Sequence, residues 1–299
     1  MGDPLRMTRV RQILFVAPAP VVWARHLGLF EANGLEVETT QTVSSDQIGQ
    51  GLADGTWDVG IGVVDNVLAW NADRHAGLQI LAQLERTQAM AFCARPGCPS
   101  LADAALETIA VDATTNGFVL VLYRALARAG IARETCRFEP VGGVRQRFEA
   151  LVAGKVAATI LVPPFIDMAL ARGCVRLWNG ADVAPAYPGV VATARKAWLE
   201  SNRQSALAYL RALRSAHRWA TDPAQREAAI AALVASGYAT PAAGRLLDDA
   251  MPGLEPSRYG WDETVELRRE ARLLDGAPPR FDDVVAVELL KEAASGPDK

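Results

Sequence analysis

The sequence predicts an α/β protein built as two lobes that close on each other as a clamp. Two observations support this fold class. Short β-rich runs alternate with helical stretches from Val10 to Trp178, and the alternation starts again at Thr108, after the proline-rich stretch Pro96–Pro99. Such alternation is typical of mostly parallel sheets that are flanked by helices and joined by right-handed crossovers. The second unit shows no sequence repeat of the first, so only the architecture is repeated.

The first unit contains four expected strands and three expected helices. The helices are expected to end at glycines, since Asn33-Gly34 and Gly55 are typical helix stops, and Ser44 or Ser45 is a suitable N-cap. The strands are expected at Val10–Val16, Leu35–Val43, Trp57–Val63 and Leu78–Leu84. The helices are expected at Val21–Ala32, Ser45–Leu52 and Asp65–Trp70.

The second unit repeats this order of elements. Its strands are expected at Ala89–Ala94, Thr108–Val111, Cys136–Pro140, Ala157–Val162 and Val175–Trp178. Its helices are expected at Gly117–Ala129, Val144–Val152 and Pro164–Ala171. Beyond Pro188 apolar residues recur at helical spacing, which predicts helices at Arg195–Thr221, Pro223–Ala235, Pro241–Ala250 and Trp261–Leu274.

These late helices are expected to pack on the first lobe, so that this lobe is discontinuous in sequence. The first lobe then comprises residues 9–88 and 188–294, and the second lobe comprises residues 89–187. Residues 295–299 are expected to form a disordered tail.

Composition argues against several classes of function. The 299 residues include 31 basic and 34 acidic side chains, a net charge of −3, so no broad positive field attracts nucleic acid or an anionic membrane. The three histidines and four cysteines are scattered without metal-ligand spacing, and phosphate-loop and dinucleotide fingerprints are absent. We therefore expect no metal and no cofactor. The absence of an export signal or an apolar run of ~20 residues predicts a cytoplasmic protein, or a periplasmic one if the start is truncated.

Three segments give the sequence a resemblance to a known family. The run Ala24–Val37 resembles the opening G-L-F-x-x-x-G-L-x-V of type II periplasmic solute-binding proteins, in particular the set that serves uptake of sulfonates, nitrate and thiamine pyrimidines. Gln50–Gly60 and Ser100–Asp103 match two later hallmarks of that family in the same order. The resemblance covers roughly residues 10–290 and implies the type II periplasmic-binding-protein fold, with a small-molecule ligand between the lobes.

Ligands of open α/β sheets bind at the carboxyl ends of the strands, and four strand-to-helix loops are therefore candidates. Trp23 could stack on a planar ligand or merely cover its lobe, and Asp65 and Asn66 could bind a ligand or cap a helix. The loop Thr114, Thr115, Asn116 and Gly117 offers hydroxyls, an amide and free N–H groups for an anion or amide. Phe165 could face the cleft or fill a core, and Tyr187 lies near the return crossing between the lobes.

The expected function is binding of a small organic molecule, planar and either anionic or amide-bearing. An ATP-binding-cassette permease would be a partner only if the protein is exported, and the oligomeric state is open. The alternative is a cytoplasmic enzyme, such as a decarboxylase, desulfinase or hydrolase, because some enzymes share the fold that the resemblance implies. Its acid–base candidates are Asp65, His26 and Arg25. A third hypothesis is an intracellular sensor that docks to a partner when closed.

Overall fold

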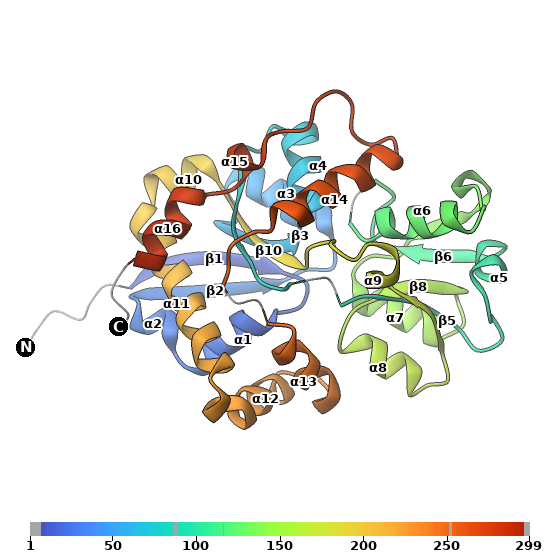
Figure 1. Cartoon of the computed structure of the whole chain (residues 1–299), viewed down its shortest axis with the longest axis horizontal. Helices are drawn as coiled ribbons and strands as arrows, with labels where there is room; N and C mark the ends of the chain where they lie inside the picture. Colours follow the sequence, from blue (N-terminus) through green and yellow to red (C-terminus); the bar gives the residue numbers. More distant parts are fainter. Residues whose placement is uncertain (1–6, 87–88, 116, 251–252, 296–299) are drawn as a thin grey trace, which may run out of the picture.

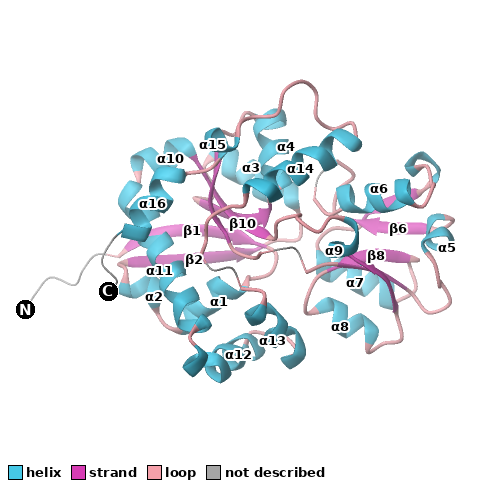
Figure 2. Cartoon of the chain, in the orientation of Figure 1, coloured by secondary structure: helices cyan, strands magenta, loops and turns pink. Residues whose placement is uncertain are grey.

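The computed structural model describes residues 7–86, 89–115, 117–250 and 253–295. Two sheets of five strands each form the centres of two lobes that lie side by side (Figures 1 and 2). This is the two-lobed type II periplasmic-binding-protein fold, as expected from the sequence. The boundaries of the lobes at residues 88/89 and 187/188 remain predictions.

The first sheet has the strand order β2-β1-β3-β10-β4. Its strands are β1 (Thr8–Leu14), β2 (Leu35–Gln41), β3 (Val59–Val63), β4 (Leu78–Gln83) and β10 (Val190–Arg195). β1 pairs in parallel with β2 and β3, whereas β10 runs antiparallel between β3 and β4, with Val190 opposite Val63. The chain thus returns to the first sheet after it has built the second.

The expectation of helix throughout the region beyond Pro188 is wrong for β10. The segment Val190–Arg195 has valines and a threonine that favour strands, and the interior of its strand is buried. Its two partners come from residues more than 100 positions earlier in the sequence, so local periodicity could not reveal the pairing.

The second sheet has the order β7-β6-β8-β5-β9, and β5 runs antiparallel to both of its neighbours. Its strands are β5 (Ala91–Ala94), β6 (Thr108–Val111), β7 (Arg137–Pro140), β8 (Ala158–Leu161) and β9 (Val175–Asn179). The parallel core β7-β6-β8 therefore places the carboxyl ends of these strands at the edge that faces the first lobe (Figure 2).

Helices cover both faces of each sheet. In the first lobe they are α1 (Ala19–His26), α2 (Leu29–Ala32), α3 (Ser45–Asp54) and α4 (Asp65–Arg74). The single helix expected at Val21–Ala32 is divided because Gly28 adopts a left-handed conformation (φ 63°), which favours glycine. The second lobe carries α5 (Leu101–Ala105), α6 (Val119–Arg128), the 3₁₀ turn η1 (Arg133–Thr135), α7 (Val144–Val152), α8 (Phe165–Leu170) and α9 (Gly180–Val183).

The C-terminal region is helical. It comprises α10 (Lys196–Ser201), α11 (Arg203–Thr221), the 3₁₀ turn η2 (Pro223–Gln225), α12 (Arg226–Ala235), α13 (Thr240–Asp248), α14 (Arg258–Glu270), α15 (Phe281–Val284) and α16 (Val287–Ser295). α11 packs against α1 and α2 of the first lobe, where Tyr209 stacks on Phe30 with 5.3 Å between ring centroids. Ser295 ends α16, and residues 296–299 of the expected tail lie outside the described residues.

α14 lies against both lobes (Figure 1). It contacts α4 of the first lobe and α6 of the second. The sequence led us to expect that the late helices pack on the first lobe, and α14 in addition contacts the second lobe.

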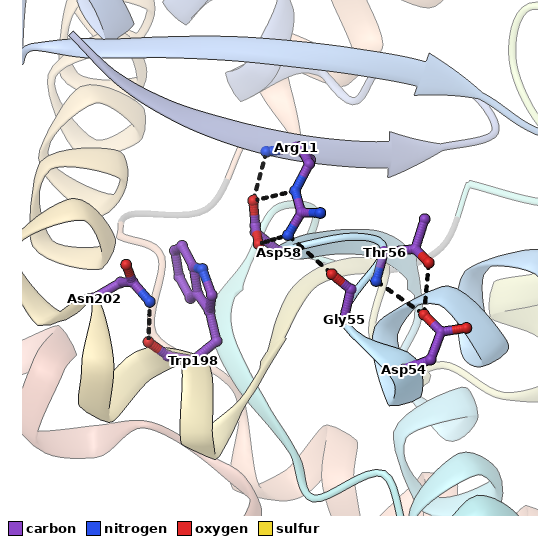
Figure 3. Close-up of polar contacts among 7 residues, drawn as sticks. All are labelled: Arg11, Asp54, Gly55, Thr56, Asp58, Trp198 and Asn202. Carbon is purple, nitrogen blue, oxygen red and sulfur yellow. Dashed lines mark hydrogen bonds and ion pairs between the residues drawn. The ribbon is translucent and has the colours of Figure 1, made fainter. Parts of the chain in front are cut away.

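A charged pair fixes the start of β3 against β1 (Figure 3). The Asp58 carboxylate accepts hydrogen bonds from the Arg11 backbone N–H (2.9 Å), Nε (3.0 Å) and Nη2 (2.6 Å), and Arg11 also donates to the Gly55 carbonyl. Beside it, Asp54 accepts from the backbone and hydroxyl of Thr56, which closes the turn that follows α3. Within the described residues no helix has the length and apolar character needed to cross a membrane.

Candidate functional site

A cavity of about 100 Å³ lies between the two lobes. Its walls come from the segments that follow β1, β3, β6 and β8, together with the starts of α4, α6 and α7. These are the carboxyl ends of parallel strands, where ligands of open α/β sheets bind. Most lining side chains are apolar, among them Phe15, Ile61, Phe118, Ile160 and Leu246.

Asn66, in the first turn of α4, is a buried polar residue in this wall. It is 3% exposed, and its Oδ1 has no hydrogen-bond partner among the residues that the structure describes. A buried amide oxygen without a partner carries a desolvation cost of about 1–3 kcal/mol, so such atoms are usually satisfied by water or a ligand.

Arg147, Asp112 and Glu85 are the charged residues that line the cavity. Arg147, on α7, is 4% exposed and donates Nε to the Gly142 carbonyl (3.0 Å) and Nη1 to the Ile160 carbonyl (2.7 Å). Burial lowers the pKa of Arg147 to about 10, although the negative charge of Asp112 acts in the opposite direction. Burial raises the pKa of Asp112, while Arg147 and the hydroxyl and amide of Ser45 favour its charged form.

Asp65 links the lobes from a fully buried position beside the cavity. Its carboxylate accepts the Gly117 backbone N–H at 2.9 Å, the Tyr187 hydroxyl at 2.9 Å and Arg268 Nη1 at 3.4 Å. Burial raises the pKa of Asp65, against the opposing effects of Arg268 and these hydrogen bonds. All of these partners belong to the protein, so Asp65 acts as an interlobe contact. The expectation that Asp65 binds the ligand or acts as an acid–base catalyst is not supported by this arrangement.

A second interlobe contact lies between α6 and α14. Arg124 of α6 donates Nη1 to Glu263 (2.6 Å), and Nε and Nη2 to Glu270 (2.7 and 3.0 Å). The other carboxylate oxygen of Glu263 accepts the Ala186 backbone N–H in the return crossing. Three separate segments are therefore held together by one ion-pair network.

Trp23, Phe165 and Tyr187 do not line the cavity. Trp23 is fully buried and donates its indole N–H to the Ala229 carbonyl of α12 at 3.0 Å. Phe165 packs against Phe148 in the core of the second lobe. The Tyr187 hydroxyl donates a hydrogen bond to Asp65. Trp23 lines a smaller cavity of about 20 Å³ that shares Glu85, Ala89 and Leu246 with the first, so its expected stacking role stays a prediction. Phe165 and Tyr187 make these structural contacts, and neither lies in the wall of the first cavity.

Arg25 and His26 lie outside the cleft. α1 starts near the carboxyl end of β1, and these two residues are in its last turn, so about 1.5 Å per residue carries them away from the cavity. Both are exposed, Arg25 donates to the Thr39 hydroxyl, and His26 lies 6.1 Å from the Trp219 ring. Neither residue lines the cavity, and their role as acid–base candidates stays a prediction.

The loop before α6 is only partly at the cavity. Gly117 lines it, whereas Thr114 and Thr115 are exposed and their carbonyls accept from Tyr123 and Arg268. Asn116 lies outside the described residues. Of the groups expected to form an anion site on this loop, the Gly117 N–H is already donated to Asp65.

Sequence reasoning missed Arg147, Asp112 and Tyr238 as cavity residues. Arg147 carried a signal, since it stands between Val144 and Leu151 on the apolar face of its helix. Tyr238, whose hydroxyl donates to the Ala17 carbonyl at 2.9 Å, comes from the distant C-terminal region and carried no such signal. Among the described residues no group of three His, Cys, Asp or Glu side chains could hold a metal ion.

Comparison with solved structures shows which proteins share this fold. The periplasmic aliphatic sulphonate binding protein SsuA of Escherichia coli has a TM-score of 0.69 and 20% identity, with 95% of this chain and 99% of that chain covered. The periplasmic nitrate-binding protein NrtA of Synechocystis PCC 6803 has a TM-score of 0.76 and 14% identity, over 96% and 88%. The desulfurization enzyme DSZB has a TM-score of 0.71 and 17% identity, over 96% and 98%.

At these identities the likeness shows the fold alone. No curated protein sequence matches the chain. The NMT1-like family matches residues 12–235. Because that match spans more than half of the chain, the protein belongs to the NMT1-like family, in agreement with the resemblance seen in its sequence.

Proposed function

We propose that this protein binds a small organic molecule in the cavity between its lobes. The observation that carries the proposal is the cavity itself: both lobes contribute apolar walls, and the unpartnered Asn66 Oδ1 is buried in one of them. Apolar cavities with a few buried polar groups are the usual form of small-molecule sites. The sulphonate- and nitrate-binding neighbours, which share the fold, support a binding role.

Binding would draw on Asn66 from the sequence-based set, with Gly117, Phe15 and Phe118 as contacts in the cavity wall. A planar ligand suits walls that carry two aromatic rings. Hinge motion about the two crossings between the lobes would admit it.

A thermal-shift screen tests the proposal. The full chain is incubated with aromatic carboxylates, sulfonates, amides and pyrimidines, and each mixture is examined by mass spectrometry for products. A bound ligand at about 100 times its Kd adds about 2.7 kcal/mol to the stability of the folded state, which a melting curve detects. A shift without product supports binding, whereas turnover supports the enzymatic alternative that the fold of DSZB leaves open.

A matched pair of variants locates the effect. Val162→Trp fills the cavity and should abolish the shift, whereas Val152→Trp adds the same bulk at a position on α7 that is 36% exposed. An equal shift in the wild type and in Val162→Trp would refute binding at this cavity.

The periplasmic location of the sulphonate- and nitrate-binding neighbours supports the periplasmic alternative for this chain, and with it a permease partner. Fusion of the native amino terminus to an export reporter tests that location. Efficient export would favour an uptake receptor over a cytoplasmic enzyme or sensor.

A further inference from the structure

Each lobe places a carboxylate at the start of a helix in the other lobe. Asp65 of the first lobe accepts the Gly117 N–H just before α6 of the second lobe. Asp112 of the second lobe lies at the start of α3 of the first, where the Ser45 hydroxyl and amide favour its charged form. Helix starts attract anions because their N–H groups are unpaired and the helix dipole is positive there. In this protein both positions are filled by the protein's own anions.

The cationic side chain in the cavity wall is partly engaged by the protein. Arg147 Nε and Nη1 each donate an N–H to a backbone carbonyl, and Asp112 lines the same cavity as a negative charge. An added carboxylate or sulfonate would therefore meet Asp112 as well as Arg147. Burial of an anion without a counter-charge of its own is strongly unfavourable.

Asn66 supplies a neutral acceptor. It lines the cavity and is 3% exposed, and its Oδ1 has no hydrogen-bond partner among the described residues. The Glu85 carboxylate in the same wall adds a second negative charge to that of Asp112, which disfavours a bound anion further. A neutral N–H or O–H group would satisfy Asn66 Oδ1. A cavity of about 100 Å³ is smaller than the ~150 Å³ that accommodates benzene in an engineered protein core, so in this arrangement of the lobes a ligand is limited to about one ring.

We infer that the ligand is an uncharged, one-ring molecule that places an amide-like N–H donor on Asn66, and that the cavity discriminates against carboxylates and sulfonates. This inference rests on the proposed function and narrows the ligand class. The Gly117 N–H is already taken by Asp65, and the negative charges of Asp112 and Glu85 share the cavity wall with Arg147; these features set the charge selectivity, and Asn66 sets the hydrogen-bond selectivity.

Matched neutral and anionic compounds test the inference by calorimetric titration of the full chain. The pairs are benzamide with benzoate and benzenesulfonamide with benzenesulfonate, at neutral pH. The neutral member of each pair should bind at least tenfold more tightly. Equal or tighter binding of the anions would overturn the inference and leave the proposed function intact, whereas no binding by either pair and no hit in the thermal-shift screen would overturn both.

Two variants separate the contributions. Asn66→Ala should weaken benzamide binding at least tenfold. Asp112→Asn removes the negative charge beside Arg147, so it should reduce the benzamide preference over benzoate at least threefold. Asp73→Asn, an exposed position in the last turn of α4, is the matched control and should leave the preference unchanged. An unchanged preference in Asp112→Asn would contradict the assigned role of Asp112.

Discussion

The Asp65 carboxylate of the first lobe accepts the backbone N–H of Gly117 in the second lobe at 2.9 Å. The same buried carboxylate is bonded by Tyr187 in the return crossing and by Arg268 of α14. Four segments that are distant in sequence thus converge on one negative charge. The orientation of the two lobes depends on this charge because each partner would otherwise be a buried, unsatisfied donor.

Replacement of Asp65 should therefore be costly. Asp65→Ala leaves the positive charge of Arg268 buried without its partner, and we expect a loss of about 3–5 kcal/mol in the free energy of unfolding. Urea denaturation measures it. Tyr187→Phe is the control that removes one hydrogen bond only, with an expected loss of about 1 kcal/mol. Similar losses for the two variants would show that Asp65 is not the centre of the interlobe contact.

The sequence predicted the helices and strands around this site better than the directions of its side chains. The helix Val144–Val152 and the strand Thr108–Val111 were predicted at their observed ends, because glycines and apolar periodicity mark such boundaries locally. The position of the cavity followed from the rule for strand carboxyl ends. The direction in which a loop side chain points depends on packing from elsewhere in the chain. This is why the sequence left open whether Trp23 stacks on a ligand or covers its lobe, and could not show that Thr114 is exposed.

Asp65 illustrates the limit most clearly. From the sequence, Asp65 is interpreted as a helix cap, because it stands at the start of a predicted helix and capping depends only on neighbouring residues. In the structure its carboxylate is bonded to the residue before the start of a different helix, 52 positions away. Only the closed arrangement of the lobes reveals that relation.

The network of Arg124 with Glu263 and Glu270 should hold the lobes closed. Arg124→Met preserves the length of the side chain but leaves Glu263 largely buried without a cation, with an expected loss of about 2 kcal/mol in unfolding free energy. We also expect a larger radius of gyration in small-angle X-ray scattering, because α14 no longer ties α6 to the first lobe. The control Arg95→Met breaks an exposed pair with Glu107 and should change neither quantity appreciably. An unchanged radius in Arg124→Met would argue against a role in closure.

Two glycine-to-alanine substitutions should have opposite effects on stability. At Gly60 in β3 an added Cβ would lie 2.6 Å from Leu52 Cδ1 and 2.9 Å from Ile48 Cγ2, so overpacking should cost about 1–3 kcal/mol. At Gly244 in α13 an added Cβ meets nothing within 4 Å, and alanine should stabilise the helix by about 0.5–1 kcal/mol. Thermal melts of the two variants measure both effects. A stabilising Gly60→Ala would show that β3 and α3 are less tightly packed than described.

His217 should make stability depend on pH. It is 5% exposed on α11, its Nε2 has no partner among the described residues, and burial lowers its pKa from the ordinary value of 6.5. Arg214 lowers the pKa further, whereas Glu255 opposes the shift. Since the folded state binds the proton more weakly than the unfolded state, the free energy of unfolding should fall as pH decreases below about 6.5 and through the folded-state pKa.

The comparison that isolates this effect is with His217→Gln, which has no titrating group at that position. Denaturant titrations at several pH values between about 7.5 and 5.0 should show a steeper loss of stability in the wild type than in the variant. Asp and Glu side chains titrate mainly below this range and are common to both proteins, so they cancel in the difference. Parallel pH curves for the two proteins would mean that His217 takes up its proton equally well in the folded and unfolded states, and its burial would then have no energetic consequence.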